Sequence, residues 1–270
     1  MFKNAYSIEK TERKILEPLN EQQRLPVLDY EGPQIVLAGA GAGKTATIVA
    51  RTKNMINHGV DPHRILLFTF TRKGADEIKS RVVSGVGEKG LAVTMGTYHS
   101  FCGRLLRRYV ERFKIWTRNF TIYDSDDSAD VLKKIMKKID DADNTINVHV
   151  VSSCISRWKE RMMSPIDAAS QTKNSRDRFI AKVYKSYAET LKASNAMDFD
   201  DLIYYTIRLF EQHPDIRERV SSNYDYVIAD ESQDSSPRDL ELIYHLCFPK
   251  MNICLVGDDY QSKPICSRCE

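Results

Sequence analysis

The sequence has 270 residues, of which 42% are hydrophobic, 29% charged and 9% aromatic. These values exclude collagen-like, low-complexity and largely disordered chains. A formal net charge of +3 is too small to indicate nucleic-acid or membrane binding by itself, so any basic surface must come from local clustering. No stretch approaches the roughly 18 apolar residues of a membrane span. We therefore expect a globular protein without a membrane partner.

The cysteines point to a reducing compartment. Six are scattered through the chain, unlike the dense framework of small secreted proteins, so we expect free thiols and a cytoplasmic protein. The N-terminus also lacks the apolar core of a signal peptide. Cys266 and Cys269 form one CxxC pair, but a structural zinc site needs four ligands, so we expect no zinc site there.

Short apolar runs rich in β-branched residues indicate a parallel sheet. They occur at residues 34–38, 64–70, 91–97, 224–230 and 252–257. Such runs are typical of strands buried on both faces. Helical patterns at residues 45–59 and 72–83 separate the first three runs, as βαβ units require. The sequence predicts an α/β fold.

A long segment without strand patterns interrupts this sheet. From Tyr98 to about Ala193 the apolar residues recur at helical spacing, which predicts an α-helical insertion. A further helix, capped by Asp198 and ending near His213, is expected before the sheet resumes at Tyr224.

The stretch LAGAGAGKT, residues 37–45, follows one predicted strand and opens a predicted helix. That context separates a phosphate-binding loop from a chance glycine-rich turn. Gly39, Gly41 and Gly43 let the backbone approach phosphate oxygens, Lys44 supplies a cation and Thr45 supplies a magnesium ligand. The sequence predicts a P-loop nucleotide site.

An acidic pair follows the fourth apolar run, in VIADESQD. Hydrolysis at a P-loop needs a second metal carboxylate and a group that orients water. We expect Asp230 to hold Mg²⁺ and Glu231 to act as the general base. An acidic loop after a strand is common by itself, so the P-loop is what gives this pair its meaning.

Six ordered segments resemble the motifs of the UvrD/Rep/PcrA family of superfamily 1 DNA helicases. They are LNEQQ (19–23), AGAGAGKT (38–45), FTFTRKGADEIKSRV (68–82), GTYHS (96–100), DESQD (230–234) and VGDDYQS (256–262). The resemblance runs from about Leu19 to Ser262. It implies a RecA-like domain 1A split by a helical domain 1B. The expected boundaries are an N-terminal extension (1–18), domain 1A (19–101 and 198–262), domain 1B (102–197) and a divergent tail (263–270).

The resemblance implies an ATP site with Mg²⁺ as cofactor. Gln23 would read adenine, which its amide can do by pairing with a donor and an acceptor. The phosphates would lie against Ala38, Gly39, Ala40, Gly41, Ala42, Gly43, Lys44, Thr45 and Ala46. Many relatives carry Arg where this chain has Ala46, so the contact with the base is expected to be looser. Catalysis would use Lys44, Glu231 and Gln261, a γ-phosphate sensor, with Gln233 in the same coupling region.

The resemblance also implies a single-stranded DNA or junction partner. The DNA contacts would come from Phe70, Thr71, Arg72, Thr97, Tyr98 and His99, which offer a stacking face, phosphate donors and a cation. Phe70 could instead be a core residue, and His99 a capping or buried one. Residues 101–120 interleave arginines with aromatics; they could contact DNA, although helical spacing favours a packed aromatic face and solvated arginines.

The sequence after Ser262, KPICSRCE, departs from the family, in which a second RecA-like domain, 2A, follows. We therefore expect a half-motor that binds Mg·ATP, hydrolyses it weakly and does not unwind DNA alone, with domain 2A supplied by a separate chain or lost. The alternative is a nucleotide-gated module that binds DNA or a partner without turnover. A P-loop kinase would explain neither GTYHS nor VGDDYQS.

Overall fold

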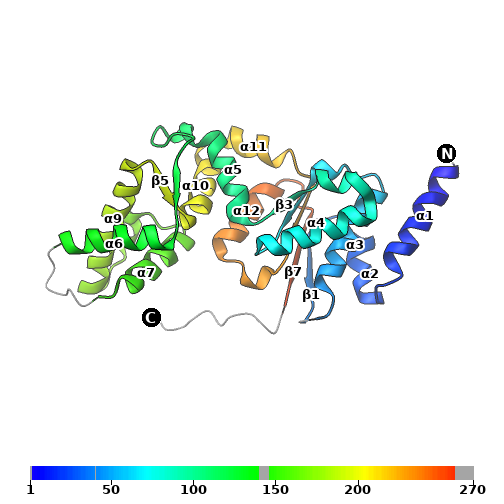
Figure 1. The fold of residues 1–270 in the computed structure, drawn as a ribbon, viewed down its shortest axis with the longest axis horizontal. Helices are drawn as coiled ribbons and strands as arrows, with labels where there is room; N and C mark the ends of the chain where they lie inside the picture. The colour runs from blue at the N-terminus through cyan, green and yellow to red at the C-terminus, as the bar shows by residue number, and fades with distance from the viewer. Residues whose placement is uncertain (1, 40, 140–145, 259–270) are drawn as a thin grey trace. The chain divides into compact units, whose positions relative to one another are not determined.

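The structure is a computed structural model that describes residues 2–39, 41–139 and 146–258. It divides into two compact units. Among the described residues, a sheet unit runs up to Tyr98 and includes Pro214–Ser235 and residues 243–258. A helical unit comprises His99–His213 and Ser236–Leu242. Figure 1 labels their elements.

The sheet unit alternates strands and helices, as expected. Its elements are α1 (Phe2–Leu16), α2 (Glu21–Leu28), β1 (Gln34–Leu37), α3 (Lys44–Asn57), β2 (Ile65–Phe68), α4 (Arg72–Val86), β3 (Thr94–Gly96), α11 (Pro214–Ser221), β6 (Tyr226–Ala229) and β7 (Ile253–Gly257). Short 3₁₀ turns lie at Pro62–Arg64, Gly87–Ala92 and Ser232–Asp234. The last helix, α12 (Pro237–Cys247), contributes its first residues to the helical unit.

The five strands pair in parallel in the order β1-β7-β6-β2-β3. Their register aligns the carboxyl ends. Leu37 is opposite Gly257, while Phe68 is opposite both Ala229 and Gly96. The segments that follow these strands therefore meet at one edge of the sheet, where ligands bind in open α/β folds.

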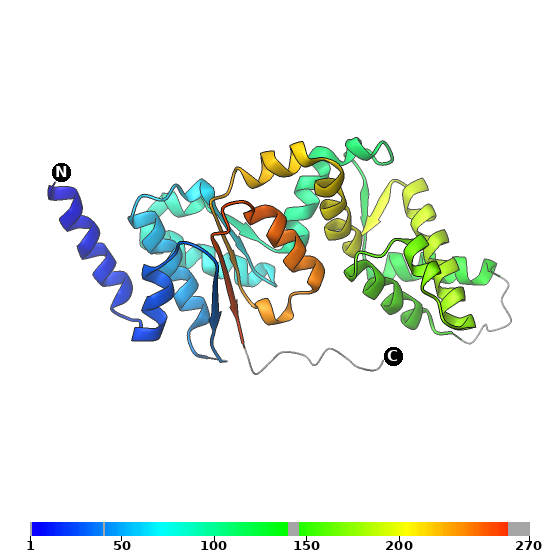
Figure 2. The same ribbon diagram turned by 180° about the vertical axis from the view of Figure 1, so that it is seen from behind.

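One face of the sheet carries the main core, in which residues of α3 and α4 pack on the strands. Its buried members include Ile48, Met55, Leu67, Ile78, Ile228 and Val256. The opposite face of β1 is open, because Ile35 is 69% and Leu37 63% exposed, and Figure 2 shows β1 unobstructed from that side. The expectation that every strand is buried on both faces is therefore wrong for β1, the terminal strand of the described sheet.

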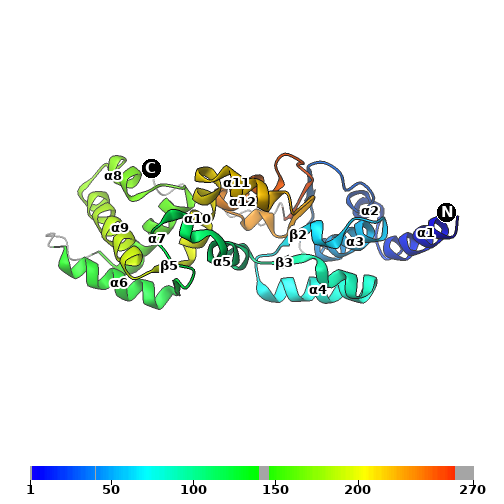
Figure 3. The same ribbon diagram turned by 90° about the horizontal axis from the view of Figure 1, so that it is seen from above.

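The helical unit is built mainly from α5 (Tyr98–Tyr109), α6 (Ser125–Lys138), α7 (Val148–Glu160), α8 (Pro165–Ser170), α9 (Ser175–Ala193) and α10 (Phe199–Gln212). Figure 3 shows α6, α7 and α9 gathered against one another. The unit also contains a strand that the sequence did not indicate: β4 (Thr121–Tyr123) pairs in parallel with β5 (Ala196–Asp198). Strands of three residues are too short to produce a recognisable alternation.

Strand β5 leads directly into α10, and both elements belong to the helical unit. Asp198 caps α10 in a capping box with Asp201, as its sequence predicts. Lys159 of α7 bonds to both of these carboxylates. Residues 198–213 thus belong to the helical unit, whereas the expected boundary assigned them to domain 1A.

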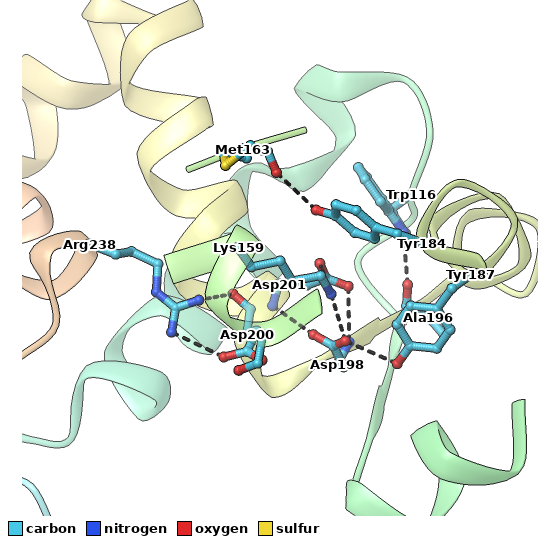
Figure 4. A network of polar contacts seen from close by, with 11 residues as sticks. Trp116, Lys159, Met163, Tyr184, Tyr187, Ala196, Asp198, Asp200, Asp201 and Arg238 are labelled. Atoms are coloured by element: carbon cyan, nitrogen blue, oxygen red, sulfur yellow. Dashed lines mark hydrogen bonds and ion pairs between the residues drawn. The ribbon is translucent and has the colours of Figure 1, made fainter. Parts of the chain in front are cut away.

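A polar network is buried in the helical unit (Figure 4). The Lys159 ammonium lies 2.6 Å from Asp198 Oδ2 and 2.7 Å from Asp201 Oδ1. The Tyr187 hydroxyl donates to Asp198 Oδ2 at 3.0 Å. Such full pairing is what allows charged groups to be buried.

A membrane-spanning helix must be both long and apolar. Among the helices of the described residues, none meets both requirements.

Candidate active site

The P-loop follows β1 at the carboxyl edge of the sheet. The Ala38 N–H donates to the Gly257 carbonyl of β7 at 3.0 Å, which extends the pairing of the two strands by one bond. The loop then turns through Gly41 and Gly43, with φ values of 76° and 85°, which glycine adopts without a Cβ penalty. Lys44 begins α3, so the first N–H groups of this helix are available to an anion.

Gln23 reaches the P-loop from α2. Its Oε1 accepts the Asn20 N–H at 3.0 Å in a capping box, and its Nε2 donates to the Ala42 carbonyl at 2.7 Å. The amide lies so close to Gly43 that an added Cβ there would be 2.5 Å from Nε2. Both ends of the amide that was expected to read adenine thus bond to backbone groups in this structure.

Lys44 lies between two carboxylates that follow neighbouring strands. Its Nζ is 3.5 Å from Glu231 Oε2 and 3.7 Å from Asp258 Oδ2. Asp258 directly follows β7, and it is only 2% exposed. Sequence reasoning assigned no role to Asp258, although its position at the end of a buried strand in the motif VGDDYQS was a usable signal.

Asp230 directly follows β6 and is largely buried. Burial, followed by the charge of Glu231, raises the pKa of its carboxyl to about 6. The Glu231 N–H, which donates to Oδ1 at 2.9 Å, and Lys44 partly offset this increase. A carboxylate held among cations and N–H donors is a suitable magnesium ligand once Mg²⁺ adds its own charge.

Glu231 is held by an amide clamp. Its backbone has a φ of 52°, a left-handed conformation that is uncommon for a residue with a side chain. Gln233 Nε2 donates to Glu231 Oε2 at 2.6 Å, and Gln233 Oε1 accepts the Asp258 N–H at 2.9 Å. Gly257 makes room for this clamp, because an added Cβ would be 3.0 Å from Gln233 Oε1.

The residues present fit a magnesium ion bound together with phosphate. Asp230 and the Thr45 hydroxyl are oxygen donors, the type that Mg²⁺ prefers, and Mg²⁺ commonly takes its other ligands from phosphates and water. No cluster of three or more His, Cys, Asp or Glu side chains suited to a metal occurs among the described residues. Ala40, Gln261, Cys266 and Cys269 lie outside those residues.

Four of the expected DNA-contact residues follow β2 and β3 in the sheet unit: Phe70, Thr71 and Thr97 lie in the loops, and Arg72 begins α4. Phe70 is 57% exposed, which excludes the core-packing alternative. The Thr71 hydroxyl caps α4 by accepting the Gly74 N–H at 3.1 Å. Arg72 is exposed and Thr97 half-buried. The segment after β2 therefore presents an aromatic face, Phe70, and a cation, Arg72, at the carboxyl edge of the sheet.

Tyr98 differs from this pattern. Its side chain is 5% exposed, and its ring stacks on Phe68 with centroids 4.5 Å apart. The Tyr98 ring is therefore part of the core and not an accessible platform for a base.

His99 belongs to the helical unit, next to an aromatic residue that sequence reasoning did not assign. Its ring makes an edge contact with Phe199, with centroids 5.9 Å apart, and Phe199 is 47% exposed. Burial, followed by the charge of Arg238, lowers the pKa of His99, so the ring is neutral near pH 7. The usable signal for Phe199 was its position directly after Asp198, the predicted cap of a helix.

In the segment 101–120, which interleaves arginines with aromatics, the aromatic side chains mostly pack inside the helical unit and do not form a surface for DNA. Trp116 is 3% exposed and contacts Phe113 and Tyr205. Arg107 lies over the Phe120 ring at 4.7 Å and donates to the carbonyl of Arg118. The aromatic residues thus build the helical unit, and at least one arginine has a structural role.

The motifs and their geometry agree with the comparisons to known proteins. Residues 19–262 match the UvrD/REP helicase N-terminal domain. The chain belongs to the UvrD/REP helicase family. It is 36% identical to ATP-dependent DNA helicase PcrA of Staphylococcus epidermidis RP62A over 249 residues, 92% of this chain and 34% of that protein. The same identity and shares hold for PcrA of Staphylococcus aureus Mu50.

The chain thus spans about a third of the length of these relatives. Membership of the UvrD/REP helicase family confirms the resemblance seen in the six motifs. The parallel sheet with its inserted helices also confirms the expected α/β fold class.

Proposed function

We propose that this chain is the ATP-binding portion of an ATP-dependent DNA helicase or translocase. One observation carries the proposal: Lys44, the first residue after the P-loop turn, lies between Glu231 and Asp258 at 3.5 and 3.7 Å. This arrangement brings a phosphate-binding cation and two carboxylates from separate strands to one edge of the sheet.

The chemistry follows from these groups. The P-loop N–H groups and Lys44 bind the β- and γ-phosphates. Thr45 and Asp230 would hold Mg²⁺, which would supply positive charge to neutralise the phosphate oxygens. Glu231 accepts a proton from the attacking water, and Gln233 orients that carboxylate through its bond to Oε2. Gln261 is proposed as the γ-phosphate sensor.

DNA is the proposed second substrate. The exposed Phe70 ring can stack on a base, and Arg72 can contact a phosphate. His99 and Phe199 form an aromatic pair in the helical unit. A single strand or a junction between single- and double-stranded DNA fits these residues.

We further propose that the 270-residue chain hydrolyses ATP slowly and does not unwind DNA alone. Within the described residues, Lys44 is the cation that pairs with the carboxylates of this site. Phosphoryl transfer in related enzymes gains about 10³ to 10⁵ in rate from an added arginine. A separate chain could supply such a group as a domain 2A.

The test is ATP hydrolysis by the purified chain, with and without single-stranded DNA, with Lys44→Ala as the blank. Slow turnover that depends on Lys44 and rises with DNA supports the proposal. ATP binding without any turnover above the blank supports the nucleotide-gated binding module. Failure of Mg·ATP to bind contradicts both.

A further inference from the structure

A buried arginine connects the helix that carries Gln23 to the helix that carries Lys44. Arg51 lies on α3, and only 2% of it is exposed. Its guanidinium donates to backbone and side-chain oxygens of α2, of β1 and of the segment between them. The acceptors are the Pro26 carbonyl, the Asp29 carbonyl at 3.1 Å, the Tyr30 carbonyl at 3.1 Å and Gln34 Oε1 at 2.6 Å.

These bonds complete the carboxyl end of α2. The last carbonyls of a helix have no partner within the helix, and here α3 supplies donors to two of them. Arg51 bonds to Pro26, and Asn54 Nδ2 donates to the Val27 carbonyl at 3.0 Å. A cation at a helix C-terminus also interacts favourably with the helix dipole. Burial of a guanidinium is costly unless such partners are present, so this position favours a single arrangement.

The other end of α2 contacts the P-loop. Gln23 lies in the first turn of α2 and bonds to the Ala42 carbonyl at 2.7 Å. A helix of eight residues is about 12 Å long and moves as one body. A shift at the Arg51 end therefore displaces the Gln23 amide relative to Gly43, where an added Cβ would be 2.5 Å from it.

We propose that Arg51 is a positioning residue for the base half of the nucleotide. It fixes the carboxyl end of α2 and thereby holds the Gln23 amide beside the P-loop. The amide has a second N–H and a second lone pair beyond its bonds to Ala42 and Asn20, and these recognise the base. This inference rests on the proposed function, in which ATP binds at the P-loop. The phosphate half of the nucleotide is held by the P-loop itself and does not depend on this brace.

Lysine is the informative replacement because it keeps the charge but has one nitrogen. It cannot bond to four acceptors that surround a planar guanidinium. Helix α2 remains docked through a small apolar cluster of Leu19, Val27 and Ala50. Arg51→Lys is therefore expected to loosen the orientation of α2 without releasing it.

The experiment compares three ligands by isothermal titration calorimetry on the full chain: Mg·ATP, Mg·GTP and Mg·tripolyphosphate, which lacks base and sugar. For Arg51→Lys we expect ATP affinity to fall about tenfold, the size of one lost hydrogen bond. Tripolyphosphate affinity should change less than about twofold, and the preference for ATP over GTP should decrease. Gln34→Ala, which removes one acceptor of the same guanidinium, should shift the values in the same direction by less.

Arg64→Lys is the matched control. Arg64 pairs with Asp225 at 3.0 and 2.7 Å at the amino end of β2, opposite to the edge that carries the P-loop. The Arg64→Lys variant should therefore leave the affinities for all three ligands unchanged. Equal weakening of ATP and tripolyphosphate in Arg51→Lys, or an unchanged ratio of ATP to GTP in both test variants, overturns the inference. Failure of the wild-type chain to bind either ATP or tripolyphosphate would instead refute the proposed function.

Discussion

Replacement of Lys159 by methionine tests how the helical unit tolerates its buried charges. Lys159 is 2% exposed, and its ammonium is the cation between Asp198 and Asp201. Methionine retains most of the side-chain volume but removes the charge and the hydrogen-bond donors. The variant leaves both carboxyls buried without their shared partner, while the Tyr187 hydroxyl still bonds to Asp198.

The expected loss follows from this geometry. Removal of one partner from a buried ion pair costs about 3 to 5 kcal/mol. Both contacts of Lys159 are short, at 2.6 and 2.7 Å, so the upper part of that range applies. Because Asp198 and Asp201 also form the capping box of α10, the loss should include the start of that helix.

Urea unfolding followed by tryptophan fluorescence measures this loss. Both tryptophans, Trp116 and Trp158, belong to the helical unit, so the signal reports that unit. Lys133→Met is the control, because its partner Asp130 is 66% exposed and such pairs are worth about 0.5 kcal/mol or less. Addition of Asp198→Asn and Asp201→Asn to Lys159→Met should recover most of the stability, because these three positions then carry no charge.

The pH dependence provides a second measurement on the same network. Burial, followed by the charge of Asp198, raises the pKa of Asp201 to about 7, although Lys159 opposes the increase. A folded pKa above the unfolded value of about 3.9 means that the folded state binds this proton more tightly. This stabilisation is complete at low pH and is lost as pH rises through about 7, with a slope of at most about 1.4 kcal/mol per pH unit. Asp201→Asn should remove that slope between about pH 4 and pH 7, which are the unfolded and folded pKa values of this carboxyl.

The reasoning is refuted if Lys159→Met and Lys133→Met lower the free energy of unfolding by the same amount with unchanged m-values. It is also refuted if the triple variant is no more stable than Lys159→Met. Either result would mean that water or rearrangement satisfies the two carboxyls without the lysine.

Two further predictions concern the nucleotide site. Gly43→Ala should weaken Mg·ATP binding at least about tenfold, because an added Cβ there lies 2.5 Å from Gln23 Nε2. Gly59→Ala controls for backbone strain, because Gly59 has a φ of 94° and open space around it. This control variant should leave Mg·ATP binding unchanged. Gln233→Met should lower single-turnover hydrolysis about 100-fold, the cost of a misplaced reacting group, because Glu231 loses its amide partner at 2.6 Å. ATP affinity should stay within about twofold of wild type, and equal loss of binding and rate would contradict a purely orienting role.

The parts of this site that the sequence predicted are those encoded locally. The P-loop needs glycines at fixed spacing, and Asp230 and Glu231 follow a continuous apolar run. Strand periodicity and turn chemistry act over a few residues, so they can be recognised without a structure.

The remaining parts depend on contacts between distant residues. Gln233 and Asp258 are 25 positions apart in the sequence, yet the Asp258 N–H donates to the side-chain amide of Gln233. In the sequence Arg51 is one charged residue within a predicted helix. Its burial depends on the α2–β1 segment, whose Asp29 and Tyr30 carbonyls accept from its guanidinium. The pairing of β4 with β5 spans residues 121 and 196. No local pattern specifies which side chain satisfies a backbone carbonyl in another element.

The open face of β1 has a consequence for how the chain behaves at high concentration. Ile35 and Leu37 present adjacent branched side chains on the outermost described strand. Strand edges of this kind promote intermolecular pairing unless a charge interrupts them. In Ile35→Lys the charged side chain would lie on the same open side. This substitution should raise the concentration at which light scattering detects oligomers. Colloidal behaviour would thereby be adjusted at a strand that carries the P-loop, without a change in the residues that contact the nucleotide.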